Sequence, residues 1–408
     1  MPIDLTDREW PERVRGIGVN LRHRAYVNEG QMIAMSLGFT EMYEPIPADE
    51  AYVTALAVDD RQVVYGGTGG RRAHLFAGLT RGLSGAVVDM AVLQENARTT
   101  SVAVTRGGDV LAATAPGRPL PAPQPPGRRP SGEGAIFGHE PSGTGGDLIH
   151  EWHFSKVPAE KLTVPLPEEG IADAVLAEAE PGRELLVGIG ERTGTLFTYD
   201  PAAEETEVVG PVDEHELFSP TLTVGPDGRV YGGAALGELW SFDPADGRLE
   251  KTGLEIPSQA GREVRNHVDS FAVDSDRGLI YGGGTADGVL FAFDPAAATV
   301  RSIGKPTCNR GIKGLTVTND GRLFGVSGRK TEIAHLFCYD PGTHQLRDLG
   351  LIASVLQERV YGYEFSCGAA GEDGQIFFGE SERGGHLWIY WPAIKAPNQP
   401  SDSDGRSE

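Results

Sequence analysis

The stretch PDGRVYGGAALGELWSFDP, residues 226–244, consists of short apolar runs separated by turn residues. Pro226-Asp227-Gly228-Arg229 is a turn signature, and the run that follows it ends in Tyr231-Gly232-Gly233. The next run ends in Phe242-Asp243-Pro244. Runs rich in Val, Tyr, Phe and Leu that are bounded by Asp-Gly and Asp-Pro turns predict short β-strands. The stretch therefore predicts consecutive strands rather than an amphipathic helix.

This phrase recurs along the chain, and the recurrence predicts the architecture. A lone four-stranded unit cannot bury both of its faces, so the units are expected to stack around an axis. The spacing of most copies lies near the period of roughly 40–50 residues that is typical of propeller blades. The sequence thus predicts an all-β, seven-bladed β-propeller with four-stranded antiparallel blades. The glycine or alanine after each second strand marks the copies at Gly66, Ala112, Gly188, Gly232, Gly282, Gly325 and Gly379.

The domain organisation follows from the limits of the repeat. We expect an N-terminal extension over residues 1–37, one propeller domain over residues 38–393 and a disordered tail over residues 394–408. The last unit ends early, at Trp391-Pro392, and lacks a fourth strand. Residues 38–45 resemble the fourth strand of other units, so we predict that an N-terminal strand completes the last blade and closes the ring.

One segment interrupts the repeat. Residues 116–146 are rich in Pro, Gly and Arg. Proline at this density disrupts strand ladders, so we predict an extended loop inserted in blade 2. The loop is either a simple decoration, a lid over one face of the ring or an arm that docks a partner.

The composition limits the partners of the protein. A net charge of −22 argues against nucleic acid, because phosphate neutralisation requires clustered Lys and Arg. No stretch reaches transmembrane length and the first residues lack the apolar core of a secretory signal, so we expect no membrane partner. Three cysteines, Cys308, Cys338 and Cys367, form neither an even set nor a metal-type spacing. We expect a cytoplasmic monomer with free thiols.

The phrase PDGRVYGG…GELWSFDP resembles the blades of bacterial propellers of the kelch-like, virginiamycin-lyase-like and polysaccharide-lyase-like groups. The resemblance covers about residues 40–393 and implies the propeller fold. It does not specify an activity, since the turn and strand-end residues serve a structural purpose in many propellers.

The residues just before each innermost strand are candidates to face the mouth of the central channel. If these segments are extended, residues at even offsets share a face. Four cations and several aromatic residues then meet at one mouth, with Arg310 nearby and His215 in the loop that enters blade 4. The predicted collection on this face is Tyr52, Arg98, Arg265, His267, Lys313, Arg359, Tyr361 and Tyr363.

This collection predicts an anion site in a strongly acidic chain. Clustered cations concentrate anions, and arginine forks fit carboxylate, sulfate or phosphate groups. The expected partner is an anionic small molecule or an acidic oligosaccharide. We assign proton transfer to His267, Tyr361 and Tyr363. The predicted substrate-binding residues are Tyr52, Arg98, His215, Arg265, Arg310, Lys313 and Arg359.

Histidine and tyrosine beside arginines fit a lyase that acts by β-elimination at a uronate, since the cations neutralise the carboxylate while His or Tyr moves the proton. The resemblance to propeller polysaccharide lyases favours this hypothesis. Three alternatives stay open: a noncatalytic anion pocket, a noncatalytic scaffold for protein–protein interaction, and purely structural pairing of the arginines with Glu50, Glu216, Asp269 and Glu358. No metal-ligand set is recognised, although a divalent cation on the propeller axis is compatible with the fold.

Overall fold

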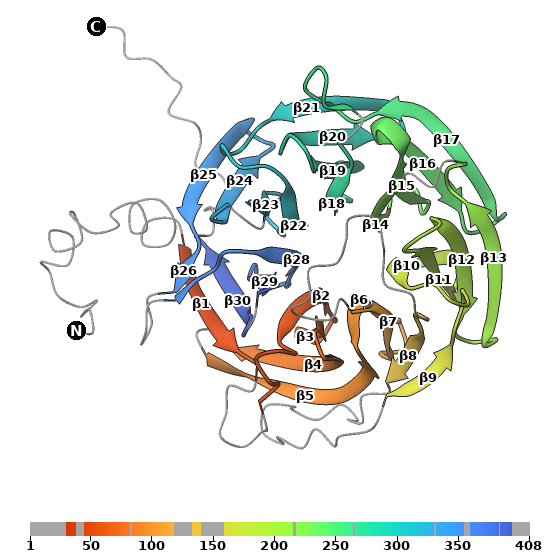
Figure 1. Cartoon of the computed structure of the whole chain (residues 1–408). Helices are drawn as coiled ribbons and strands as arrows, with labels where there is room; N and C mark the ends of the chain where they lie inside the picture. The colour runs from red at the N-terminus through yellow and green to blue at the C-terminus, as the bar shows by residue number, and fades with distance from the viewer. Residues whose placement is uncertain are drawn as a thin grey trace, which may run out of the picture.

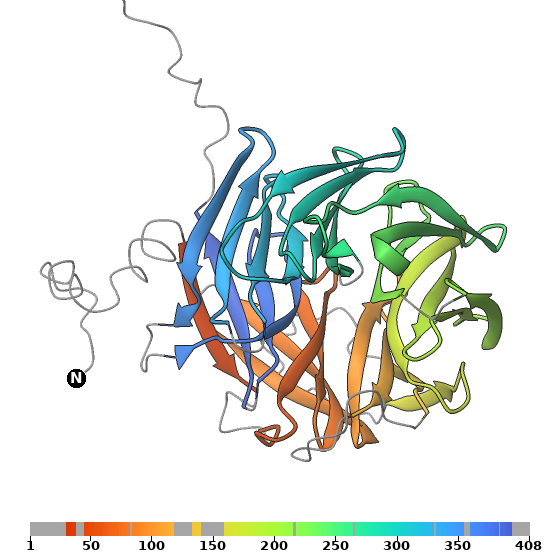
Figure 2. The ribbon, with the colours of Figure 1, turned by 45° about the horizontal axis from the view of Figure 1, so that its top comes forward.

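Seven four-stranded antiparallel blades form a closed ring around a central channel (Figure 1). The structure is a computed structural model, and a tilted view shows the blades standing side by side around the axis (Figure 2). It describes residues 30–37, 45–81, 84–117, 133–139, 159–214, 218–263, 266–329, 332–354, 360–382 and 384–393. The predicted fold class, blade number and strand number per blade are confirmed.

The first four blades run from the innermost to the outermost strand in chain order. A single residue pair, Gly69 with Arg98, joins blades 1 and 2 into one sheet path. Blade 1 comprises β2 (Tyr52–Val58), β3 (Val63–Gly69), β4 (Arg72–Arg81) and β5 (Ser84–Glu95), and blade 2 comprises β6 (Ala97–Val104), β7 (Val110–Pro116), β8 (Ile136–His139) and β9 (Glu160–Thr163). Blade 3 comprises β10 (Ile171–Glu180), β11 (Arg183–Gly190), β12 (Thr195–Asp200) and β13 (Glu205–Pro211), and blade 4 comprises β14 (Phe218–Val224), β15 (Val230–Ala234), β16 (Glu238–Asp243) and β17 (Arg248–Glu255).

The last three blades follow the same order, except that the final one borrows its outermost strand from the start of the chain. A short ribbon, β26 (Ala353–Ser354) with β27 (Val360–Tyr361), precedes blade 7, and a 3₁₀ turn, η2 (Ala235–Gly237), lies in blade 4. Blade 5 comprises β18 (Val268–Asp274), β19 (Leu279–Gly284), β20 (Leu290–Asp294) and β21 (Thr299–Gly304), and blade 6 comprises β22 (Ile312–Val317), β23 (Leu323–Ser327), β24 (His335–Asp340) and β25 (Gln345–Leu351). Blade 7 comprises β28 (Phe365–Ala370), β29 (Ile376–Glu380), β30 (His386–Pro392) and β1 (Gly30–Ser36).

In five blades the glycine that marks the repeat makes room for an aromatic ring of the third strand. In blade 4 the ring of Trp240 covers Gly232, and in blade 3 the ring of Phe197 covers Gly188. A methyl group at either glycine would overlap that ring. Trp240 and Phe197 are fully buried, and burying an aromatic side chain of this size contributes about 1.5–3 kcal/mol. The repeated glycine therefore reflects the packing of these blades.

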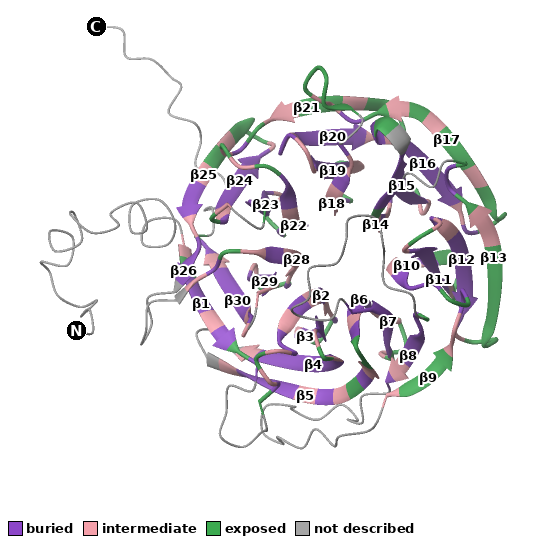
Figure 3. Cartoon of the chain, in the orientation of Figure 1, coloured by how far each residue is buried: buried purple, intermediate pink, exposed green. Residues whose placement is uncertain are grey.

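The apolar core lies between neighbouring blades rather than within one sheet. One cluster, for example, joins Val187 and Ile189 of blade 3 to Leu222 and Trp240 of blade 4. Burial decreases outward: the second and third strands are largely buried, whereas the outermost strands β13 and β17 are mostly exposed (Figure 3). Each blade is thus stabilised by the next one around the ring.

The ring is closed by a strand from the beginning of the chain. β1 pairs antiparallel with β30 over its whole length, from Gly30 opposite Pro392 to Ser36 opposite His386. The prediction of an N-terminal clasp is confirmed, but the strand lies earlier than the segment proposed from the sequence. Residues 38–44 of that segment lie outside the described residues.

The insertion predicted over residues 116–146 is wrong in its extent. Ile136–His139 is strand β8, the third strand of blade 2, and β7 continues to Pro116. The run Ala135-Ile136-Phe137 contains no proline and is buried, so it pairs with β7 in spite of its proline-rich context. Residues 118–132 and 140–158, like the tail over residues 394–408, lie outside the described residues.

Two further features bear on the sequence predictions. The three cysteines are free thiols, with Cys308 exposed and Cys338 buried. Within the described ranges, no helix is long and apolar enough to cross a membrane.

The clasp strand should be a main determinant of stability. Ile33 is 6% exposed and packs with residues of blades 1 and 7. Truncation of a buried isoleucine leaves a cavity, so Ile33→Ala should lower the free energy of unfolding by about 2–4 kcal/mol in chemical denaturation. Gln31→Ala, an exposed position on the same strand, is the control. Equal stability of the two variants would show that β1 does not close the ring.

Candidate functional site

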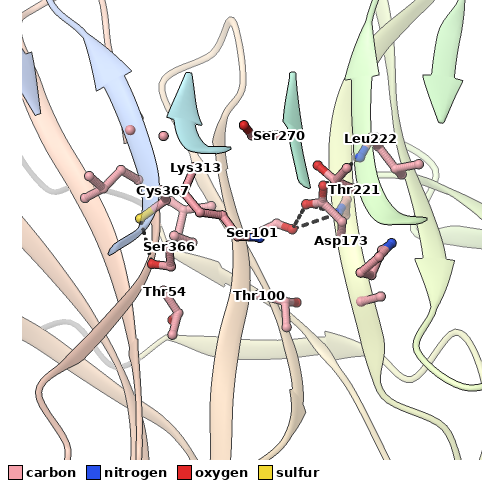
Figure 4. Close-up of a pocket in the computed structure, with 18 of the residues that line it drawn as sticks. Thr54, Thr100, Ser101, Asp173, Thr221, Leu222, Ser270, Lys313, Ser366 and Cys367 are labelled. Carbon is pink, nitrogen blue, oxygen red and sulfur yellow. Dashed lines mark hydrogen bonds between the residues drawn. The ribbon is translucent and has the colours of Figure 1, made fainter. Parts of the chain in front are cut away.

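The central channel is the candidate site. Each innermost strand contacts the innermost strand of the next blade, and β28 of blade 7 contacts β2 of blade 1. Residues from all seven innermost strands line a cavity of about 410 Å³ on the axis (Figure 4). This volume lies within the range of roughly 300–1,000 Å³ that is common for small-molecule pockets.

A β-bulge or other register irregularity in every innermost strand shapes this cavity. The register against the second strand shifts in all seven blades, for example between Val53 and Ala55, between Thr99 and Ser101, and between Val268 and Ser270. A bulge inserts an extra residue and re-aims side chains. Thr54, Thr100 and Asp269 are the extra residues in blades 1, 2 and 5, and all three line the cavity.

The bulges invalidate the even-offset rule used on the sequence. A shift of one residue moves the side chains beyond it to the other face of a strand. Thr54 and Lys313 stand two residues before Leu56 and Leu315 of their strands and line the cavity. Tyr52 and His267 stand four residues before Leu56 and Phe271 and do not line it. Among the described residues at this offset of four, Arg98 is the one that lines the cavity.

Of the predicted cations, two reach the cavity. Arg98 and Lys313 line it, from blades 2 and 6. Arg310 does not, and its guanidinium pairs with Glu332 at 3.1 Å in an exposed position. Arg265, Arg359 and His215 lie outside the described residues.

The predicted proton-transfer residues do not meet in the cavity. Tyr361 lies in β27 and pairs with β26, and Tyr363 is 45% exposed in the segment that leads to β28. His267 stands just before β18, and its Nδ1 atom is buried without a hydrogen-bond partner among the described residues. Burial and nearby Arg329 lower the pKa of His267 against the influence of Asp269, which favours a neutral imidazole. None of the three lines the channel.

Lys313 is held at the cavity wall by Asp269. Its Nζ lies 3.1 Å from Asp269 Oδ1 and 3.3 Å from the backbone oxygen of the same residue. Arg329 Nη2 lies 3.8 Å from Asp269 Oδ1. The side chain of Asp269 is 6% exposed, and its Oδ2 has no partner among the described residues. The carboxylate thus fixes an ammonium group beside the channel.

Arg98 is fixed in a comparable way. Its Nη2 lies 2.8 Å from Glu191 Oε1, and its Nη1 donates to the backbone oxygen of Pro116 at 3.0 Å. Glu191 follows the second strand of blade 3, so this ion pair joins two blades. Both cavity cations are therefore paired, as the structural alternative expects, and both remain about one-third exposed.

Glu50 neutralises arginines, but not those that the sequence suggested. Its buried carboxylate pairs with Arg71 at 2.6 Å and with Arg72 at 2.9 Å, and it accepts a hydrogen bond from His74 at 2.8 Å. Burial opposes ionisation of Glu50, but the hydrogen bonds from Arg72, His74 and Arg71 outweigh it and lower its pKa to about 2. On its other side His74 contacts Asp89 at 3.1 Å. This network is a structural ion cluster of blade 1.

Asp173 is a channel residue that sequence reasoning missed. Its Oδ1 accepts from Ser101 Oγ at 2.5 Å, and its Oδ2 accepts from the backbone N–H of Leu222 at 2.8 Å (Figure 4). Burial raises its pKa to about 6 against these hydrogen bonds, so the channel wall changes charge near that pH. An acidic residue inside the apolar run IADAVLA, residues 171–177, was the available signal.

Other hydroxyl groups tie the innermost strands together. Thr54 Oγ1 donates to the backbone oxygen of Thr99 at 2.6 Å, which joins blade 1 to blade 2. Ser270 Oγ donates to Ile312 O at 2.8 Å, which joins blade 5 to blade 6. Ser366 joins blade 7 to blade 1, because its Oγ donates to the backbone oxygen of residue 53 at 2.6 Å. These hydroxyl groups of the channel wall thus link neighbouring blades.

The described residues of the channel do not favour a reactive thiolate or a bound metal ion. Cys367 lines it, but burial raises the pKa of this thiol to about 12, so the thiolate is scarce at neutral pH. Across the described ranges, no group of three or more His, Cys, Asp and Glu residues could hold a metal ion.

Exposed apolar residues on the same face are scattered. Antiparallel strands place the loops after the second strands on the face where the innermost strands begin, which we call the channel-mouth face. Leu236, Ile333 and Tyr363 are exposed there, each in a different blade. Isolated exposed apolar residues are common on soluble proteins and do not mark a docking patch.

Comparison with known proteins supports the fold alone. The sequence matches no protein-family model and no curated protein. Similar solved structures include the WD40 β-propeller domain of Doa1, at 10% identity and a TM-score of 0.54, with 92% of this chain and 99% of that chain covered. Sqt1 of Saccharomyces cerevisiae is 13% identical, with a TM-score of 0.52 and coverage of 91% and 99%.

A third similar structure is the extracellular domain of BT4673 from B. thetaiotaomicron, at 15% identity and a TM-score of 0.54. The match covers 88% of this chain and 39% of that chain, so this chain spans well under half of its length. At such identities the three structures show a β-propeller and no function.

The ion cluster around Glu50 should give the protein a specific acid sensitivity. The folded-state pKa of about 2 lies below the ordinary value of 4.5, so this carboxylate stabilises the fold above pH 4.5 and loses that effect as the pH falls toward 2. The unfolding free energy should therefore fall by about 1–3 kcal/mol less in Glu50→Gln than in the unaltered protein as the pH is lowered from 4.5 to 2.

The measurement is chemical denaturation at a series of pH values. Glu160→Gln, at an exposed position of β9, should retain the pH dependence of the unaltered protein. An unchanged pH dependence in Glu50→Gln would show that the cluster does not couple protonation to folding.

Proposed function

We propose that this propeller binds a small organic anion at the mouth of its central channel. The observation that carries the proposal is the position of two cations from distant parts of the chain. Lys313 of blade 6 and Arg98 of blade 2 line the same cavity of about 410 Å³ and remain about one-third exposed. Cationic groups in a confined pocket attract anions more strongly than they do on an open surface.

Both cations keep hydrogen-bond donors for a ligand. An ammonium group has three donors, and Lys313 uses two of them on the carboxylate and backbone oxygens of Asp269. A guanidinium group has five donors, and Arg98 directs two of them to Glu191 and Pro116. The existing ion pairs hold the remaining donors in place, which lowers the entropy cost of binding.

The positions of the side chains support the binding of an anion better than they support its β-elimination. A general base or acid must come within hydrogen-bond reach of the proton that it transfers. Neither Tyr361 nor Tyr363 lines the cavity, and Nδ1 of His267 is buried. The lyase hypothesis therefore lacks an assembled acid–base pair among the described residues, while the anion-binding part of the same hypothesis keeps Arg98 and Lys313.

Lys313→Met tests the proposal. Loss of a charge-assisted hydrogen bond costs about 1.5–3 kcal/mol, so the dissociation constant of a bound anion should rise about 10- to 100-fold. Isothermal titration calorimetry with acetate, succinate, phosphate, gluconate and uronate oligosaccharides measures it. Lys313→Arg keeps the charge beside Asp269 and should retain most of the binding. Formation of an unsaturated product, followed by ultraviolet absorbance, reports elimination in the same samples.

Arg106→Ala is the matched control on the opposite face. Arg106 pairs with Glu178 in the loop after the end of β6, so its removal should leave anion binding unchanged. Failure of all these anions to bind the unaltered protein would contradict the proposal. Equal affinities of the unaltered protein and Lys313→Met would contradict it as well.

A further inference from the structure

Four hydroxyl groups of the channel wall donate their protons to backbone oxygens. Thr54, Ser270 and Ser366 donate their protons to backbone oxygens at 2.6, 2.8 and 2.6 Å, respectively. Thr100 Oγ1 donates to the backbone oxygen of Ala113 at 3.3 Å. All four residues line the cavity (Figure 4). Backbone oxygens of the protein therefore take up the donor capacity of these four hydroxyl groups.

A hydroxyl group has one proton and two lone pairs. Once the proton is committed to a carbonyl group, only lone pairs face the channel. The carboxyl oxygens of Asp173 already accept from Ser101, Ala174 and Leu222. The hydroxyl groups of the wall are therefore the acceptors that remain, and a bound molecule must supply the donors to them.

Donors and acceptors share one level of the channel. Thr54, Thr100 and Lys313 each stand two residues before equivalent positions of their strands, Leu56, Val102 and Leu315. Asp269 lies at the same level in blade 5, and Arg98 lies two residues nearer the start of β6 than Thr100. The cavity therefore places Lys313 among the hydroxyl groups of the wall, with Arg98 nearer the mouth.

We propose that the ligand of this channel is a polyhydroxylated carboxylic acid, that is, a sugar acid, a conclusion that rests on the anion site proposed above. Its carboxylate contacts Lys313 and Arg98, and its hydroxyl groups donate to the oxygens of Thr54, Thr100 and their equivalents. An acid with an alkyl chain would leave these acceptors unpaired when it displaces water, which costs binding energy.

A metal cation is the competing occupant of an acceptor-rich channel. The ammonium group of Lys313 lies at the level of the wall hydroxyl groups, and Asp269, the carboxylate at that level, is already paired with it. Within the described residues, no group of three His, Cys, Asp and Glu side chains could coordinate a metal cation. A polyol chain that carries one carboxylate can pair with both the cations and the hydroxyl oxygens, whereas a metal cation can pair with the oxygens alone.

The test compares three molecules of similar size on the full chain: gluconate, hexanoate and sorbitol. Gluconate has both the carboxylate and the hydroxyl groups, hexanoate lacks the hydroxyl groups, and sorbitol lacks the carboxylate. Gluconate can make several polar contacts that each of the other two molecules lacks, and each contact is worth about 0.5–1.5 kcal/mol. Calorimetry should therefore show gluconate binding at least about tenfold more tightly than hexanoate or sorbitol.

Thr100→Val isolates the contribution of the wall. Valine has nearly the same shape and removes one acceptor, so the affinity for gluconate should fall about three- to tenfold while that for hexanoate does not fall. Thr206→Val, at an exposed position of β13, is the control and should leave both affinities unchanged. Thermal unfolding of each variant checks that the fold is retained.

The outcomes separate this inference from the anion site on which it rests. If hexanoate binds as tightly as gluconate and Lys313→Met weakens both, the anion site stands and the sugar-acid inference is overturned. Failure of gluconate, hexanoate and the other anions to bind would overturn both. Binding of calcium alone, with no binding of gluconate, would overturn the sugar-acid inference in favour of a cation.

Discussion

Hydrogen bonds between neighbouring innermost strands are the constraint on which the rest of this structure depends. Blades pack on one another through apolar side chains, and such packing is not directional. Thr54, Ser270 and Ser366 add directional links from one blade to a backbone oxygen of the next. Ser101 and Asp173 extend these links across blades 2, 3 and 4. The links hold the innermost strands at a spacing that leaves a channel of defined width.

The same links determine the chemistry of the channel. A hydroxyl group that bonds to the next blade cannot also donate to a ligand, so the structural function of the wall makes it an accepting surface. The cations of the cavity also serve the structure, since Asp269 and Glu191 hold Lys313 and Arg98 in place. Most polar groups of the candidate site are thus also structural groups, and this is why the same cations fitted both a purely structural and a ligand-binding interpretation of the sequence.

The sequence predicted the blades well because their signals are local. The glycine of one strand and the aromatic residue of the next, such as Gly232 and Trp240, lie a few residues apart and meet in one sheet. The site was predicted less well, because a bulge of one residue reverses which side chains face the axis. That shift placed Thr54 in the channel instead of Tyr52, and nothing in the alternation of apolar and polar residues marks it.

The clasp between β1 and β30 has a consequence for biosynthesis. A nascent chain releases β1 from the ribosome first, but its partner emerges only after all the other strands have been made. Until then the apolar residues Met32, Ile33 and Met35, which are buried in the finished ring, have no permanent cover. Exposed apolar strands of this kind are prone to aggregate and to engage chaperones. The strand that completes the ring is therefore open to aggregation for most of the time that the chain is being translated.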